Sequence, residues 1–287
     1  MLLLRRAIAA LQGAGHRVRL LAPAAPAAAL VGRGRGEVDE ALPWDGAEVA
    51  ALLAGDDTSG PVSTALASAD TVLAFTRSEP VASAFRARCR RLLAWDPAPP
   101  PDGPHASAWL ARSLGPLGLE APSDLPPLDF TEAERREAER RTAGLPRGFV
   151  AVHPGSGSAA KNWPFDRFAR VAHDLAGDAP WLLVHGPTEQ GWPVPERAVP
   201  AREWPLRVLG AVLGRSGLFL GNDSGASHLA AAAGAPTLAL FGHTDPVLWA
   251  PVGTSVATLR SASGAMSDLR EDEVLAAARQ LAGEPFR

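Results

Sequence analysis

Apolar residues in the first half of the chain alternate between helical stripes and short continuous runs. Leu4, Ile8 and Leu11 are spaced i, i+4 and i+7, which predicts a helix that stops at the glycines of residues 13–15. Strand-like apolar runs follow at 18–23, 38–42, 71–75 and 91–95. Helical stretches lie between and after them, at 46–54, 79–88 and 105–114. This alternation is typical of parallel βαβ units.

The second half repeats the alternation more regularly. Strands are predicted at 149–152, 181–184, 218–220, 237–240 and 255–259. Helices are predicted at 164–176, 205–214, 224–233 and 267–282. Pro164 stands at the start of the first of these helices and Gly234 directly after the third, as expected of helix ends. In sheets of this kind, ligands bind at the carboxyl ends of the strands.

A stretch rich in proline and glycine, residues 115–130, separates the two halves and predicts a domain boundary. Thr131 and Glu134 then form a capping box that opens a highly charged helix, which we expect to be largely solvated. The sequence thus predicts an α/β protein of two Rossmann-like doubly wound domains, at 1–125 and 126–287. Packing of the C-terminal helix back onto the first domain is left open.

The composition of the chain limits which binding partners and which cellular compartment are expected. The net charge of −3 gives no basic footprint, so nucleic acid is not an expected partner. Cys89 is the single cysteine, which excludes an internal disulfide and fits a reducing compartment. Arginines interrupt the N-terminal apolar stretch, which argues against a secretory signal, and no run reaches the roughly 18 apolar residues of a membrane span. We expect a soluble, cytoplasmic protein.

Polar residues collect where four strands of the second half end. The segments 153–164, 185–190, 221–228 and 241–246 each place glycine beside hydroxyl, acidic or imidazole groups. Glycine lets a ligand approach the backbone, and hydroxyl and N–H groups suit phosphate oxygens. The helix predicted at 224–233 directs the positive end of its dipole at the same edge, and Lys161, the chain's single lysine, adds a full positive charge. A diphosphate is the expected occupant.

Each segment also has a structural interpretation. Asp223 and Ser224 suit a helix cap, and the Gly-Ser pairs of 155–158 suit an ordinary turn. Four other residues fit structural hydrogen bonds or loop charges as well as they fit ligand contacts, namely His153, His185, Glu189 and His228. The convergence of four strand ends, rather than any single residue, favours a binding site.

The segments "VAVHPGSGSAAKNWPFDRFARVAHDL" and "LFLGNDSGASHLAAAAGAPTLALFGHTDPVLWAPVG" resemble glycosyltransferase family 9, the ADP-heptose:lipopolysaccharide heptosyltransferases. The resemblance covers most of residues 149–255, whereas the first half shares only the α/β rhythm and "VDEALPWDG". It implies a GT-B fold, with the nucleotide-sugar donor in the C-terminal domain and the acceptor facing the N-terminal one. It also implies transfer with inversion at the anomeric carbon, without a required metal or other cofactor.

The same resemblance implies which residues bind the donor. Lys161 is expected to meet the donor phosphates, Glu189 to accept hydrogen bonds from the ribose, and Asp223 to address the sugar or the pyrophosphate. The complete expected set is Ser156, Gly157, Lys161, Glu189, Asp223, Ser224, Gly225 and His228. Hydrogen-bond donors fixed around a departing diphosphate lower the barrier because they stabilise the negative charge that develops on it.

The start of the chain departs from the family pattern. Members begin with a strand and a Gly-Asp turn whose aspartate is the proposed base, whereas "MLLLRRAIAAL" resembles the helix after that turn. The N-terminal domain is therefore expected to be incomplete, and no catalytic base is assigned. Three acidic residues of the acceptor half have no local feature that recommends them, namely Asp39, Asp45 and Asp70. Either the start codon is placed too far downstream, or the protein binds a nucleotide-sugar without transferring it.

The leading hypothesis is an inverting glycosyltransferase that moves a heptose-like sugar from a nucleoside-diphosphate sugar, expected to be an ADP-sugar. The expected acceptor is a cell-envelope glycolipid or lipopolysaccharide core, with at most peripheral contact with the inner membrane surface. The alternatives are a non-catalytic nucleotide-sugar-binding protein and a GT-B-fold nucleotide-sugar epimerase, which would turn over without an acceptor.

Overall fold

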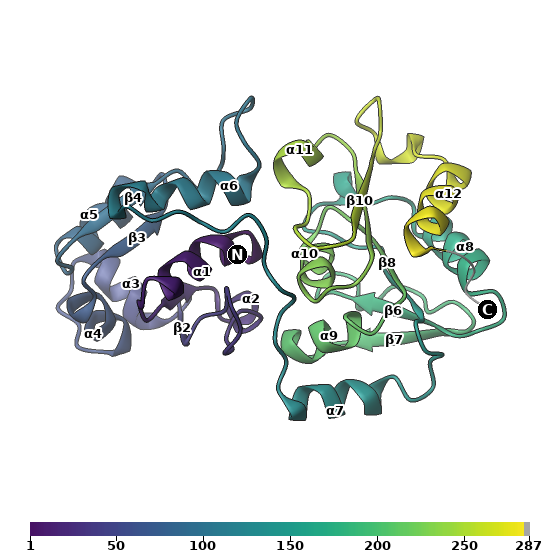
Figure 1. Cartoon of the computed structure of the whole chain (residues 1–287), viewed down its shortest axis with the longest axis horizontal. Coiled ribbons are helices and arrows are strands. Elements are labelled where there is room, and N and C mark those ends of the chain that lie inside the picture. The colour runs from purple at the N-terminus through teal and green to yellow at the C-terminus, as the bar shows by residue number, and fades with distance from the viewer. Residues whose placement is uncertain (284–287) are drawn as a thin grey trace. The chain divides into compact units, whose positions relative to one another are not determined.

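A computed structural model describes residues 1–283 of the chain. The chain divides into two compact units, Leu3–Leu125 and the residues from Pro126 onward (Figure 1). Within the described range, none of the helices combines the length and the apolar character that crossing a membrane requires.

The first unit contains four short parallel strands in two separate pairs. β1 (Arg19–Ala22) pairs with β2 (Glu40–Pro43), and β3 (Val72–Phe75) pairs with β4 (Leu92–Trp95). The helices of this unit are α1 (Arg5–Gly13), α2 (Ala24–Ala28), α3 (Ala47–Ala54), α4 (Pro61–Ser68), α5 (Glu79–Arg86) and α6 (Ala106–Ala111), with the 3₁₀ turns η1 (Leu2–Leu4) and η2 (Arg112–Leu117). The four predicted strands are confirmed in position, whereas α2 and α4 were not predicted.

One apolar cluster of the first unit lies between β2 and the helices that follow it. Its buried members are Leu42, Val49, Leu52, Val62, Leu66 and Phe85. Most residues of β3 and β4 are only half-buried, although their runs are apolar. Each strand pair is a sheet of its own, so no strand of this unit has hydrogen-bonded neighbours on both sides within the described sheets.

The second unit is built on one parallel sheet of six strands in the order β10-β9-β8-β5-β6-β7. The strands are β5 (Val150–His153), β6 (Trp181–His185), β7 (Ala198–Arg202), β8 (Leu218–Asn222), β9 (Thr237–Phe241) and β10 (Val256–Arg260). Five of them match the predicted runs. β7 was missed because "AVPAR" is short, contains Pro200 and lacks an apolar run, as is tolerated at the edge of a sheet.

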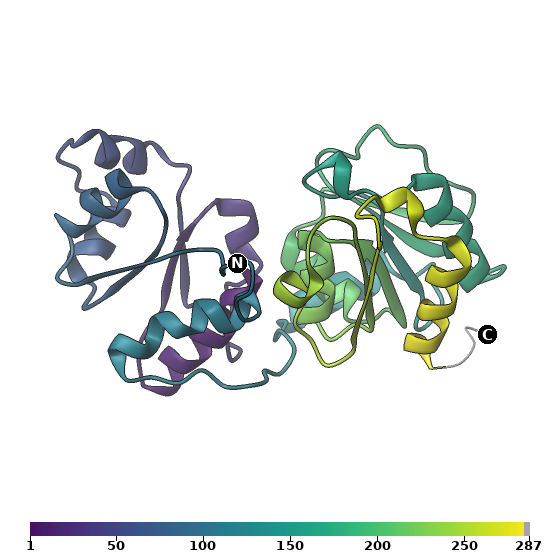
Figure 2. The same ribbon diagram turned by 90° about the horizontal axis from the view of Figure 1, so that it is seen from above.

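Helices cover this sheet (Figure 2). The helices of this unit are α7 (Glu132–Arg141), α8 (Phe165–Ala176), α9 (Leu206–Leu213), α10 (Gly225–Ala232), α11 (Pro246–Trp249) and α12 (Glu271–Ala282), with the 3₁₀ turns η3 (Ala159–Lys161) and η4 (Met266–Asp268). The strands β5, β6, β8 and β9 are buried along their whole length, which explains their continuous apolar sequence. The six-stranded sheet is thus a rigid support for the segments that leave its edges.

The C-terminal helix α12 belongs to the core of the second unit. Val274 and Ala278 are fully buried in the same apolar cluster as Val152, Leu220 and Phe168. The possibility left open from the sequence, that this helix also packs back onto the first domain, stays a prediction. Its apolar face is already used against α8 and strands β8 to β10.

The charged helix α7 also packs within the second unit, against α9. The predicted capping box between Thr131 and Glu134 is confirmed. Glu134 additionally receives a hydrogen bond from Arg207 of α9, with 2.9 Å between Nε and Oε1. Burial raises the pKa of Glu134, but the bond and charge of Arg207 and the hydrogen bonds of Thr131 together outweigh it, so the net pKa is lowered. Most charged side chains of α7 are exposed, as predicted, while Ala138 is buried.

Candidate functional site

The carboxyl ends of β5, β6, β8 and β9 lie at one edge of the six-stranded sheet, because all of its strands are parallel. The order β9-β8-β5-β6 makes these four strands consecutive neighbours. Adjacent strands are about 4.8 Å apart. The four polar segments that the sequence analysis singled out therefore leave the sheet side by side.

The Lys161 ammonium and the Asp223 carboxylate meet at this edge, with 2.7 Å between Nζ and Oδ2. Lys161 ends the turn η3 after β5, and Asp223 directly follows β8. Their side chains are 28% and 10% exposed, so the pair is largely shielded from water but accessible. The structure thus brings into contact two predicted site residues that are 62 positions apart. An incoming anion can replace the carboxylate as partner of the ammonium.

A buried amide side chain, that of Asn222, fastens the loop after β5 to the end of β8. Its Oδ1 accepts a hydrogen bond from the backbone N–H of Trp163 at 3.1 Å, and its Nδ2 donates to the carbonyl oxygen of Pro154 at 2.8 Å. Asn222 has no solvent exposure. These two bonds hold both ends of the loop that carries Lys161. Asn222 was not among the predicted site residues, although the chain has only two asparagines.

The loop itself is shaped by Ser156. Its hydroxyl lies 2.7 Å from the Ser158 carbonyl oxygen and 2.7 Å from Oδ1 of Asn162. Gly157, the glycine that the resemblance selected, is exposed with nothing near the position of a Cβ. Gly155 is the glycine in close contact, because a Cβ there would lie 2.2 Å from Cδ of Glu189 and would displace that side chain. Ser156 is therefore engaged inside the loop, and Gly155 was missed.

The helix α10 begins at this edge with its first turn uncapped by a side chain. Ser224 occupies the N-cap position in an extended conformation, yet its side chain makes no capping hydrogen bond. A Cβ at Gly225 would meet nothing within 4 Å, so the space above the helix start is open. The first N–H groups of a helix have no intrahelical partner and carry the positive end of its dipole. The structural interpretation of Ser224 as a simple cap is thus not supported, and His228 lies half-buried one turn further on.

The predicted ribose acceptor Glu189 is turned inward, with 3% of its surface exposed. Its Oε2 accepts a hydrogen bond from the N–H of Gly186 at 2.7 Å, and its Oε1 accepts one from the hydroxyl of Thr188. A Cβ at Gly186 would lie 2.4 Å from Oε2, so a side chain there, as at Gly155, would displace the Glu189 carboxylate from this position. In this structure, Glu189 joins the segments that follow β5 and β6.

Two buried histidines flank this carboxylate. His153 ends β5 and His185 ends β6, and each is 6% exposed. Nδ1 of His153 lies 3.0 Å from the carbonyl oxygen of Val184. Burial lowers the pKa of His153, and the Val184 carbonyl and the Glu189 carboxylate only partly oppose this effect. Burial, and next the charge of Arg202, lower the pKa of His185, against the influence of Glu189.

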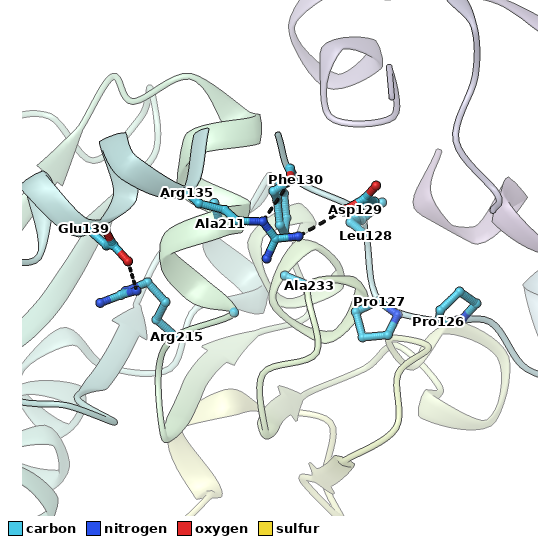
Figure 3. A pocket seen from close by; sticks show the side chains of 11 residues that line it. Pro126, Pro127, Leu128, Asp129, Phe130, Arg135, Glu139, Ala211, Arg215 and Ala233 are labelled. Carbon is cyan, nitrogen blue, oxygen red and sulfur yellow. Dashed lines mark hydrogen bonds and ion pairs between the residues drawn. The ribbon is translucent and has the colours of Figure 1, made fainter. Parts of the chain in front are cut away.

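A hollow of about 590 Å³ lies elsewhere in the second unit (Figure 3). It is lined by residues 126–130, by α7 and by the C-terminal ends of α9 and α10. Those helix ends lead into the amino ends of β8 and β9, so the hollow lies at the opposite edge of the sheet from Lys161. Its two arginines are paired, Arg135 with Asp129 and Arg215 with Glu139. The hollow is therefore separate from the candidate site.

The acidic residues considered in the first unit do not form a site. Oδ2 of Asp39 accepts a hydrogen bond from the N–H of Val18 at 3.0 Å, and Asp70 pairs with Arg90 at 3.4 Å. Both are thus engaged in local structure. Asp45 is exposed after β2. None of the three is assigned as a base.

Replacing Asn222 tests whether its amide fastens the lysine loop. In Asn222→Ala, the N–H of Trp163 and the carbonyl of Pro154 lose their partner, so the free energy of unfolding should fall by about 2–4 kcal/mol. Urea unfolding measures this, and hydrogen exchange should accelerate at residues 154–163. Asn162→Ala, at a half-buried position in the same loop, should cost less than about 1.5 kcal/mol. Equal small losses in both variants would contradict the assignment.

The buried histidines predict a pH dependence of stability. The folded state resists protonation of His153, whereas the unfolded chain takes up the proton near pH 6.5. Stability is therefore complete above about pH 6.5 and falls as the pH drops below it, by at most about 1.4 kcal/mol per pH unit for each such histidine. Urea unfolding at pH 7, 6 and 5 should show a shallower decline in His153→Asn than in the natural chain. Identical declines would show that His153 titrates equally in both states.

Comparisons with known proteins identify the family of this chain. The sequence model of glycosyltransferase family 9 (heptosyltransferase) matches residues 105–278, more than half of the chain. "Lipopolysaccharide heptosyltransferase 3" of Escherichia coli is 29% identical over 151 residues, which cover 48% of this chain and 44% of that protein. Its counterpart in strain K12 is 31% identical over 134 residues, or 43% and 38% of the two chains. The match thus spans less than half the length of these relatives.

Solved structures extend the likeness to the whole fold. The glycosyl transferase family 9 protein from Veillonella parvula DSM 2008 has a TM-score of 0.77 at 20% identity, covering 98% of this chain and 93% of that one. E. coli ADP-heptose lps heptosyltransferase II gives 0.75 at 18% identity, with 98% and 94% covered. E. coli heptosyltransferase WaaC with ADP gives 0.70 at 17% identity, with 98% and 95% covered. These values confirm the expected GT-B type of fold. The match of the sequence model over more than half of its length shows that this chain belongs to glycosyltransferase family 9.

Proposed function

We propose that the second unit binds a nucleoside-diphosphate sugar and that the protein transfers the sugar to an acceptor hydroxyl with inversion. The single observation that carries this proposal is the contact between Lys161 and Asp223 beside the uncapped start of α10. A cation and a helix N-terminus at the carboxyl edge of a parallel sheet form a seat for a diphosphate. Membership of glycosyltransferase family 9 supports the same chemistry.

In the unliganded protein, Asp223 holds the Lys161 ammonium at 2.7 Å. A diphosphate that enters would take over the ammonium, while the N–H groups at the start of α10 would contact its other oxygens. Asp223 would then be free to accept hydrogen bonds from sugar hydroxyls. Ser224, Gly225 and His228 would complete the phosphate side. Ser156 and Gly157 would act through the shape of the loop that positions Lys161.

The transfer step follows from these roles. The acceptor oxygen attacks the anomeric carbon from the face opposite the diphosphate, so that the new C–O bond forms as the bond to the phosphate oxygen breaks. Electrons move onto the leaving oxygen, and Lys161 and the dipole of α10 stabilise the negative charge there. The proton of the acceptor hydroxyl goes to a base that we do not assign to any residue of this chain.

The names of solved relatives support a proposal for the donor and the acceptor. Solved relatives include an E. coli ADP-heptose lps heptosyltransferase and WaaC with ADP. We infer an ADP-sugar with a heptose-like sugar as donor and a cell-envelope glycolipid or lipopolysaccharide core as acceptor. Transfer would take place in the cytoplasm, with at most peripheral contact with the inner membrane surface.

A donor panel tests the proposal. The natural chain should bind one of the ADP-, UDP- or GDP-sugars and release the nucleoside diphosphate only when an acceptor glycolipid is added. Turnover without an acceptor would indicate an epimerase, and binding without turnover a non-catalytic binding protein. Absence of both binding and transfer across the panel would remove the proposal.

Substitutions of Lys161 test the diphosphate seat. Lys161→Ala removes a charge-assisted contact worth roughly 1.5–3 kcal/mol, so donor affinity should fall about 10- to 100-fold. Lys161→Arg keeps the charge and should lose much less. Arg215→Ala removes a half-exposed cation from the same unit at the opposite edge and serves as the control. Equal, small effects of all three variants in calorimetric titrations would place Lys161 outside the site.

A further inference from the structure

The imidazole of His185 is buried without a hydrogen-bond partner. Only 6% of the residue is exposed, yet neither Nδ1 nor Nε2 has a partner among residues 1–283. Leaving a buried polar group unpaired costs roughly 1–3 kcal/mol. His153 at the end of the neighbouring strand differs, since its Nδ1 lies 3.0 Å from the Val184 carbonyl. Buried polar groups in native structures nearly always have a hydrogen-bond partner, so the nitrogens of His185 call for one from outside the chain, a ligand or a water molecule.

The surroundings of His185 keep its ring neutral. Burial and the charge of Arg202, its register partner on β7, lower the pKa of this imidazole, while Glu189 opposes them. A neutral imidazole has one N–H donor and one acceptor nitrogen. Such a ring matches hydroxyl and heterocycle groups better than it matches phosphate, which prefers donors and positive charge. The unused donor and acceptor of this ring therefore suit hydrogen bonds to the uncharged part of a nucleotide, the nucleoside.

The position of His185 in the sheet leads to the same part of the ligand. Lys161 and Asp223 mark the diphosphate seat at the end of β8, and β6 lies two strands away in the order β8-β5-β6. Two strand spacings amount to roughly 10 Å. A nucleotide whose diphosphate lies over β8 can thus extend its nucleoside toward the end of β6, where His185 and Glu189 lie.

We propose that His185 hydrogen-bonds the nucleoside of the bound nucleotide and contributes to the choice of nucleoside, an inference that rests on the proposed donor site. Glu189 and His185 are both covered in this structure. Binding therefore requires the turn of residues 186–191 to shift, and glycine at each end, Gly186 and Gly191, eases that movement. The unpaired ring favours the shift, because the closed arrangement leaves its nitrogens without partners.

Two variants separate this role from a structural one. His185→Phe keeps a planar ring and removes both nitrogens, whereas His185→Gln keeps one donor and one acceptor. Calorimetric titrations with ADP, GDP, UDP and inorganic pyrophosphate provide the readout. For the best-binding nucleoside diphosphate, we expect affinity to fall about tenfold in His185→Phe and to recover in part in His185→Gln. The ratio between its affinity and the affinities of the other two nucleoside diphosphates should become smaller. The affinity for pyrophosphate should stay unchanged.

Stability supplies an independent measurement. Because His185→Phe replaces an unpaired polar ring by an apolar one, its Tm without ligand should equal or exceed that of the natural chain. A lower Tm together with weaker binding of both nucleotide and pyrophosphate would make His185 structural and overturn the inference. Unchanged nucleotide affinity in His185→Phe would overturn it while leaving the donor site intact. If the natural chain binds neither nucleotides nor pyrophosphate, the proposed function itself fails, and this inference with it.

Discussion

The candidate site depends on one buried amide. A parallel sheet places the ends of β5 and β8 beside each other, but the segment from Pro154 to Trp163 is long enough to adopt many conformations. Asn222 selects one of them, because its two amide ends bond the backbone at both ends of that segment. Lys161 consequently lies next to Asp223. A fully buried amide has little freedom to exchange these partners for water, so the loop is held before a ligand arrives.

The Lys161–Asp223 ion pair and the start of α10 form the proposed diphosphate site, and the charge of Lys161 is already balanced by Asp223 before a ligand binds. Lys161 is partly shielded from water and would be costly to leave unpaired, and Asp223 meets that cost in the unliganded protein. A phosphate that replaces the carboxylate exchanges one anionic partner for another and adds the N–H groups of α10. The hollow of Figure 3 differs from this site, since it lies where α9 and α10 end, and the C-terminus of a helix carries the negative end of its dipole.

The same sheet edge carries two kinds of polarity. The charged pair lies where β8 and the loop after β5 meet, whereas His185 at the end of β6 and His153 at the end of β5 place imidazoles of lowered pKa beside the buried Glu189. Gly155 and Gly186 permit this, because a side chain at either position would collide with Glu189. A molecule with an anionic end and an uncharged heterocyclic end matches this division. The division therefore supports both the proposed donor and the role inferred for His185.

The sequence by itself determined the alternation of strands and helices, the strands of the second unit except β7, and the segments in which chemistry resides. It succeeded because buried parallel strands require continuous apolar runs, and loops at their carboxyl ends require glycine and polar residues. Only the tertiary structure decided which residues meet: the pairing of Lys161 with Asp223, the double anchoring by Asn222, the inward turn of Glu189 and the missing partners of His185. It also placed α12 in the second unit's core. Contacts between segments some 60 residues apart depend on strand order and side-chain rotamers, and local sequence patterns encode neither.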